Sequence, residues 1–96
     1  MSEPYDEEPE GLPCVLSEEV TELLMDKALP GDVFGAVVAA TVLINECRGD
    51  VPGSTASAKW PQQRRMPLGV DGSLGIAEYV IVADPPHIVL TRIQLY

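Results

Sequence analysis

The chain has 96 residues, the size of one domain, and 46% of them are hydrophobic, which is enough for a small core. Its formal net charge is −9, with 15 acidic residues against 6 lysines and arginines. Nucleic-acid affinity depends mainly on neutralising phosphates, so this charge balance argues against nonspecific binding to nucleic acid. Two cysteines, Cys14 and Cys47, without a secretory leader indicate reduced thiols, and a disulfide between them is the less favoured alternative.

The sequence shows no pattern typical of a membrane, metal or cofactor site. Its longest apolar run, residues 33–44, is shorter than the roughly 20 residues needed to cross a bilayer. One histidine and no cysteine cluster do not make a zinc ligand set, and no phosphate-binding loop or nucleophile motif is present. We therefore expect a cytoplasmic protein without a cofactor or a metal site.

Residues 1–13 differ in composition from the rest of the chain. They hold five acids and three prolines, and such a segment buries too little apolar surface to offset its ordering entropy. We predict an acidic disordered tail over 1–13 and one α+β domain over 14–96. The alternative is a short acidic arm that docks on a basic partner with Tyr5 as its anchor.

Two helices are predicted after the tail. Ser17 and the two glutamates behind it are typical of a helix start, and apolar spacing predicts a helix over about 17–28. Asp32 is the expected cap of a second helix over about 33–48. Apolar residues surround most of this second helix, so we expect it to be largely buried. A strand is the rival interpretation, but 16 residues without a turn signal are long for one.

The connection over residues 50–66 contains a small cationic cluster. Three bases and an aromatic residue lie close together in it: Lys59, Trp60, Arg64 and Arg65. These residues are candidates for nucleic-acid or partner binding, because the cations suit phosphates or carboxylates and the indole can stack on a base. A solvated loop is the plainer interpretation of the same cluster.

The pattern of residues 66–96 predicts strands. Residues 66–70 predict a short strand that Pro67 confines to an edge, and a tight turn follows it. Residues 75–96 contain two alternating apolar runs around Asp84-Pro85-Pro86 and predict a β-hairpin. Glu78 and Arg92 are expected to pair on its open face. The predicted fold is α+β, with two N-terminal helices packed on a small antiparallel sheet that ends in this hairpin (α-α-β-β-β).

This order of elements and the closing hairpin resemble the RelE/ParE superfamily of bacterial toxins. Family members commonly have a strand with tyrosine, arginine and apolar residues, a turn, and an apolar strand with an arginine that closes on a histidine or tyrosine. Here the corresponding runs are residues 76–81 and 88–96. The resemblance implies two helices against a twisted antiparallel sheet, and it implies catalytic roles for Arg92 as a cation and Tyr96 as a proton donor.

The sequence also departs from the family pattern. Ala77 and Glu78 occupy the region where the first hairpin strand usually carries an arginine, and a carboxylate there would repel a scissile phosphate. The chain is acidic, whereas such toxins are usually basic. These departures favour a toxin-like domain with a degenerate active site.

Three functional interpretations follow. The first is a noncatalytic protein-interaction module whose partner is an antitoxin-like peptide or an identical subunit lying over the open sheet face and the basic loop. The second is an active RNA endonuclease of a toxin–antitoxin system that uses Arg92, Tyr96 and residues 59–65, although the acidity disfavours RNA. The third is an acidic inhibitor that mimics nucleic-acid phosphates with residues 1–10 and the acidic side of the first helix (Glu18, Glu22 and Asp26).

Overall fold

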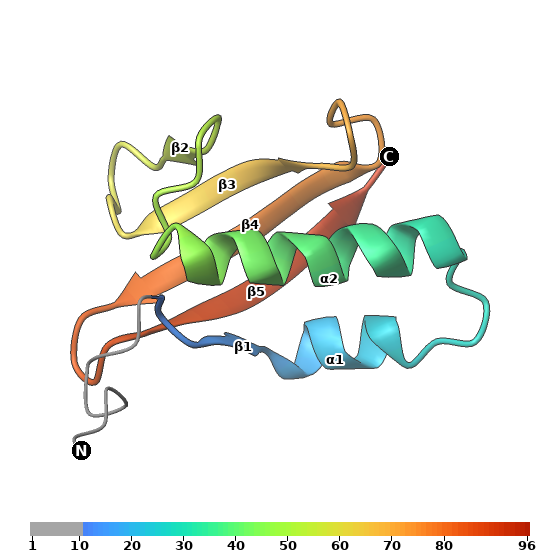
Figure 1. Cartoon of the computed structure of the whole chain (residues 1–96), viewed down its shortest axis with the longest axis horizontal. Helices are drawn as coiled ribbons and strands as arrows, with labels where there is room; N and C mark the ends of the chain where they lie inside the picture. Colours follow the sequence, from blue (N-terminus) through green and yellow to red (C-terminus); the bar gives the residue numbers. More distant parts are fainter. Residues whose placement is uncertain (1–10) are drawn as a thin grey trace, which may run out of the picture.

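The computed structural model describes residues 11–96 of the chain. Two helices lie against one side of a five-stranded sheet whose strand order is β1-β5-β4-β3-β2 (Figure 1). The elements are β1 (Cys14–Leu16), α1 (Glu18–Leu24), α2 (Gly31–Glu46), β2 (Thr55–Ala56), β3 (Gln63–Leu68), β4 (Gly75–Val82) and β5 (His87–Leu95). The predicted α+β class is therefore confirmed, while the predicted order lacked two short strands, β1 and β2.

The closing hairpin is present as predicted. β4 and β5 pair in antiparallel register, with Val80 opposite Val89 and Ala77 opposite Ile93. The ladder has one irregularity, because Tyr79 lies opposite Leu90 whereas its neighbour Glu78 lies opposite Arg92. Thr91 is thus an extra residue in β5 and makes a β-bulge. The bulge explains why Ile88 and Leu90 face the core, although strict alternation along the strand would group them with Arg92.

The prediction of an antiparallel sheet was wrong, because the sheet is mixed. β1 pairs in parallel with β5, Val15 lying opposite Val89. A three-residue strand has too few positions to show a periodic pattern, and its partner lies more than 70 residues further along the chain. Where β1 ends, Ser17 continues the contact with β5: its amide donates to the Leu90 carbonyl at 3.0 Å.

α1 begins as predicted and ends earlier. The Ser17 hydroxyl accepts a hydrogen bond from the Val20 amide at 3.2 Å and donates one to the Thr91 carbonyl at 3.0 Å. The helix was expected to reach residue 28 but ends at Leu24. The Asp26 carboxylate accepts a hydrogen bond from the Ala28 amide at 2.9 Å, and this local turn replaces the helical pattern.

α2 begins two residues before the predicted start, with Pro30 at the N-cap position and Asp32 in the first turn. Its buried residues form one stripe that packs on the sheet: Val33, Val37, Ala40 and Ile44. The prediction of a largely buried helix was wrong, because the opposite side of α2 is exposed. The helix ends as expected near Gly49, which has a φ of 88°, and a Cβ there would lie 2.6 Å from Ile81 Cδ1.

β3 is longer than predicted and begins inside the expected loop. Arg64 and Arg65 pair with Tyr79 and Glu78 of β4, and as neighbours in a strand they point to opposite faces of the sheet. Pro67 is accommodated because β2 pairs only with Arg64 and Arg65, so β3 is an edge strand at Pro67. The basic loop of the sequence is therefore divided between a strand and a turn.

Tyr79 lies at the centre of the core. Its side chain is fully buried, and its hydroxyl donates a hydrogen bond to the Gly49 carbonyl at 2.7 Å. This bond ties β4 to the segment that leaves α2. Burial raises the pKa of the Tyr79 phenol above its ordinary value.

The N-terminal prediction is only partly covered by the structure. Residues 1–10 of the predicted tail lie outside the described residues. Leu12, which was assigned to the same tail, is held against α2: its amide donates to the Asn45 carbonyl at 3.1 Å, and its own carbonyl accepts from the Asn45 side chain at 2.6 Å. Within residues 11–96, neither helix is long and apolar enough to cross a membrane.

Replacing Tyr79 by Phe tests this central contact. The change leaves the buried Gly49 carbonyl without its donor, so we expect the free energy of unfolding to fall by about 1–3 kcal/mol in urea titrations at neutral pH. Because folding raises the pKa of Tyr79, its contribution is fully present below about pH 10 and is lost as the pH rises further. The wild type should therefore lose more stability above pH 10 than Tyr79→Phe. Parallel pH profiles for the two proteins would contradict the burial of this phenol.

Candidate functional site

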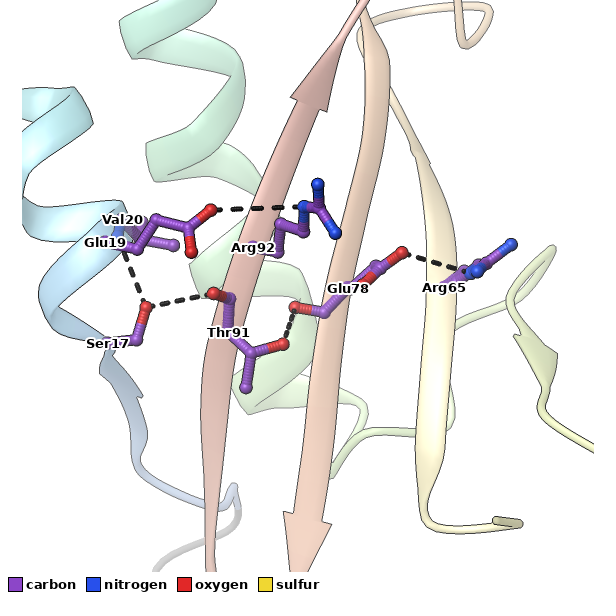
Figure 2. Close-up of polar contacts among 7 residues, drawn as sticks. All are labelled: Ser17, Glu19, Val20, Arg65, Glu78, Thr91 and Arg92. Atoms are coloured by element: carbon purple, nitrogen blue, oxygen red, sulfur yellow. Dashed lines mark hydrogen bonds and ion pairs between the residues drawn. The ribbon is translucent and has the colours of Figure 1, made fainter. Parts of the chain in front are cut away.

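Four charged side chains form a row across the sheet. They come from α1, β5, β4 and β3 in that order: Glu19, Arg92, Glu78 and Arg65 (Figure 2). The Arg65 Nε lies 3.2 Å from a Glu78 carboxylate oxygen, and the Arg92 Nε lies 4.0 Å from a Glu19 carboxylate oxygen. Glu78 and Arg92 are opposite each other in the ladder as predicted, but the expected ion pair between them is replaced by these two. We call these four residues the charged row.

The charged row has one buried member. Glu78 is only 8% exposed although it lies on the open face, and its carboxylate is held by Arg65. Arg92 and Glu19 are both well exposed, and their distance of 4.0 Å makes theirs the weaker pair. The row therefore alternates in charge, and each of its arginines already has a carboxylate partner.

Arg64 does not join the charged row. It points to the other face of the sheet, where its Nη1 lies 3.0 Å from a carboxylate oxygen of Asp50. The predicted cluster of Arg64 with Arg65 on one surface is therefore wrong. The physical reason is the alternation of side chains along β3, which a loop would not have imposed.

Tyr96 and Arg92 do not form a common site. They are four positions apart in an extended segment at the end of β5, which places their Cα atoms about 13 Å apart. Tyr96 is 79% exposed and lines a shallow hollow of about 330 Å³ together with Arg65, Thr55 and Ile76. The structure thus brings Tyr96 near Arg65 and leaves Arg92 with Glu19.

Lys59 and Trp60 lie in the turn between β2 and β3. Both are exposed, and the amide of each lies 3.3 Å from the Ser57 hydroxyl oxygen. They are not part of the charged row and do not line the Tyr96 hollow. The six predicted site residues are thus spread over four places: the charged row, the opposite face of β3, the turn between β2 and β3, and the Tyr96 hollow.

The sequence prediction missed an exposed apolar surface on α2. Six residues on the outer side of α2 are exposed and recur in pairs every four positions: Phe34, Gly35, Val38, Ala39, Val42 and Leu43. Phe34 is 45% exposed, Val38 43% and Val42 51%. We call these six residues the α2 surface. The available signal was that apolar residues surround most of the helix, but we interpreted it as a largely buried helix.

A groove runs beside the α2 surface. It has a volume of about 550 Å³ and lies between α2 and the turn that joins β3 to β4. Its lining is mostly apolar and includes Ala39, Leu43, Leu68 and Leu74. Val70, at the tip of the turn, also lines it and is fully exposed. The groove and the α2 surface share residues and form one continuous apolar area.

The cysteines and acids do not add a chemical centre to these surfaces. Cys14 and Cys47 are free thiols, as predicted, and burial raises the pKa of the Cys14 thiol, which makes it a poorer nucleophile. Among the residues that the structure describes, no group of three histidine, cysteine or acidic side chains is placed to hold a metal ion.

Comparisons with known proteins give no assignment. Neither a scan against protein-family models nor searches of curated proteins and of solved structures found a protein similar to this chain.

The charged row makes a stability prediction. Arg65→Ala leaves the buried Glu78 carboxylate without its ion pair, and we expect it to lower the free energy of unfolding by about 1–2 kcal/mol. Arg92→Ala is the matched control and should cost less than about 0.5 kcal/mol, because its pair is exposed and longer. Urea titrations of both variants test the difference, and adding Glu78→Gln to Arg65→Ala should recover part of the loss. Equal losses for the two arginines would show that Arg65 does not hold Glu78.

Proposed function

We propose that this chain acts by noncovalent association with another protein chain and that the α2 surface is the contact. In this proposal the protein is a RelE/ParE-like domain with a degenerate nuclease site, and its role is binding. The partner covers the apolar outer side of α2. This differs from the contact expected from the sequence, which was the open sheet face and the basic loop.

The exposure of the α2 surface is the observation that carries the proposal. Burying a large aliphatic or aromatic side chain is worth about 1.5–3 kcal/mol, and Phe34, Val38 and Val42 forgo about half of this in the isolated chain. A contiguous apolar area of this kind on a small soluble domain marks an interaction surface. The adjoining groove extends the area that a partner can cover.

The ion pairs of the arginines support a binding role over RNA cleavage. Phosphate chemistry needs cations that converge on one point and are available to the transition state. Here Arg65 pairs with Glu78, Arg92 with Glu19 and Arg64 with Asp50, the last on the other face of the sheet. An RNA phosphate would have to displace a carboxylate at each of them.

The third interpretation, an acidic mimic of nucleic acid, rests largely on residues 1–10, which lie outside the described residues. The acidic side of α1 is exposed, with Glu18 and Glu22 within the helix and Asp26 just after it. The Asp26 carboxylate is engaged by the Ala28 amide. We therefore keep protein association through α2 as the proposed function.

An RNA cleavage assay separates binding from catalysis. We expect no cleavage of messenger RNA, either free or on ribosomes, because the three candidate arginines are dispersed and ion-paired. The products are resolved by primer extension, with a known ribonuclease as the positive control. Cleavage that Arg92→Ala abolishes would contradict the proposal and restore the endonuclease interpretation.

Positional photo-cross-linking tests the contact itself. A photoreactive amino acid replaces Val42 in cells that express the chain, and it replaces Val15 of β1, which has similar exposure at 47%, in the control. We expect a discrete covalent adduct to a protein chain from position 42 and none from position 15. An adduct only from position 15 would move the contact to the open sheet face, and no adduct from position 42 would contradict the proposed use of α2.

A further inference from the structure

We infer that the partner on the α2 surface is a second copy of this chain, with the two α2 helices packed antiparallel about a two-fold axis. This inference rests on the proposed function and names its partner. It is carried by three features of α2: a glycine that the isolated fold does not need, a size pattern that complements itself, and a middle section, residues 33–45, without a charged side chain.

Gly35 lies inside α2, where a glycine weakens a helix relative to alanine. Nothing within the described fold requires it, because a Cβ built at this position meets no atom within 4 Å. Gly35 is exposed and belongs to the α2 surface. A small residue at such a position allows the backbone of another helix to approach closely, so Gly35 indicates a helix that packs from outside.

The side-chain sizes along α2 complement themselves when the helix is reversed. The helix spans residues 31–46, so its midpoint lies between Val38 and Ala39. A two-fold axis there places the Val38 of one copy opposite the Ala39 of the other, and Gly35 opposite Val42. Each of these contacts joins a large residue with a small one, as close helix packing requires. Phe34 then lies opposite Leu43 at the two ends of the contact.

The spacing of the α2 surface also suits a helix pair. Phe34, Val38 and Val42 form one row at intervals of four residues, and Gly35, Ala39 and Leu43 form the next. When rows of this spacing interdigitate, two helices cross at about −50°. Antiparallel packing also brings the positive N-terminal end of each helix dipole toward the negative C-terminal end of the other.

The distribution of charge along the chain favours a second copy over an unrelated partner. Residues 33–45 contain no charged side chain, although the whole chain has a net charge of −9. Two copies of so acidic a protein repel each other, and the middle of α2 offers them a contact without carboxylates, since its two acidic residues, Asp32 and Glu46, lie at the ends of the helix. A second copy offers the same uncharged length of helix. Because a contact centred on one helix is small, we expect a dimer that dissociates in the micromolar range.

Sedimentation velocity of the purified full chain over a range of concentrations is the direct test. We expect a monomer–dimer equilibrium. Val38→Glu places two carboxylates next to each other at the axis and should raise the dimer dissociation constant by about a hundredfold or more. Val15→Glu is the matched control, with the same substitution at similar exposure, and it should leave the dissociation constant unchanged.

Gly35→Ala is a second variant that does not endanger the fold. Its added methyl group meets open space in the single chain and should make α2 more stable, but it would press on Val42 of the second copy. We expect a higher melting temperature in dilute solution, together with a higher dissociation constant of the dimer. A dimer of unchanged strength in this variant would overturn the proposed packing.

Cysteine pairs test the direction of the helices. In a chain that carries Cys14→Ser and Cys47→Ser, Phe34→Cys mixed with Leu43→Cys should form a disulfide-linked heterodimer on oxidation, as antiparallel helices require. Disulfide-linked homodimers of Phe34→Cys alone would indicate parallel helices and overturn the inference.

The results separate this inference from the proposed function. A purified chain that remains monomeric at every concentration overturns the second-copy inference. If position 42 still cross-links to a different protein in cells, the proposed function survives without it. If the chain is monomeric and position 42 yields no adduct, both fail.

Discussion

The packing of α2 on the sheet determines which surfaces of this molecule are exposed. One stripe of the helix packs on the core, and the hydrogen bond from Tyr79 to the Gly49 carbonyl fixes the point where the chain leaves the helix. Because a helix can present only one side to a sheet, the other side of α2 faces outward whatever its composition. In this chain the middle of that outward side is also apolar, and a groove lies beside it.

The open face of the sheet follows a different rule. Its central carboxylate, Glu78, is nearly buried and needs a cation, which Arg65 supplies from the next strand. Arg92 is opposite Glu78 in register but pairs with Glu19 of α1. The charges of this face are thus largely compensated within the fold. A face whose charges are already paired can contribute stability and solubility, but it is poorly suited to bind an anionic substrate.

The two surfaces differ in charge, and this difference supports the proposed association through α2. The chain carries a strong negative charge, yet the middle of α2 is free of charge over thirteen consecutive positions, 33–45. Repulsion between acidic molecules disfavours contact over most of the surface, while the hydrophobic effect favours contact along α2. In the proposed dimer this combination restricts association to one area, and the sizes of a few side chains set its geometry. Gly35 is a packing residue in that proposal, because a Cβ at this position meets no atom of the single chain within 4 Å.

The local elements could be predicted from patterns within a few residues of one another. These elements are the hairpin of β4 and β5, both helices and the Ser17 cap, and together they predict the α+β class. The sequence did not reveal β1, because a parallel strand of three residues is defined only by its distant partner. It placed Arg64 and Arg65 in one loop, whereas strand pairing separates them, and it joined Arg92 with Tyr96, which the length of β5 keeps apart. An apolar residue was taken to be a buried one, but only the tertiary structure decides which side of α2 meets the core. The composition of a helix sets how much apolar surface it could bury, and packing decides how much of that surface is buried.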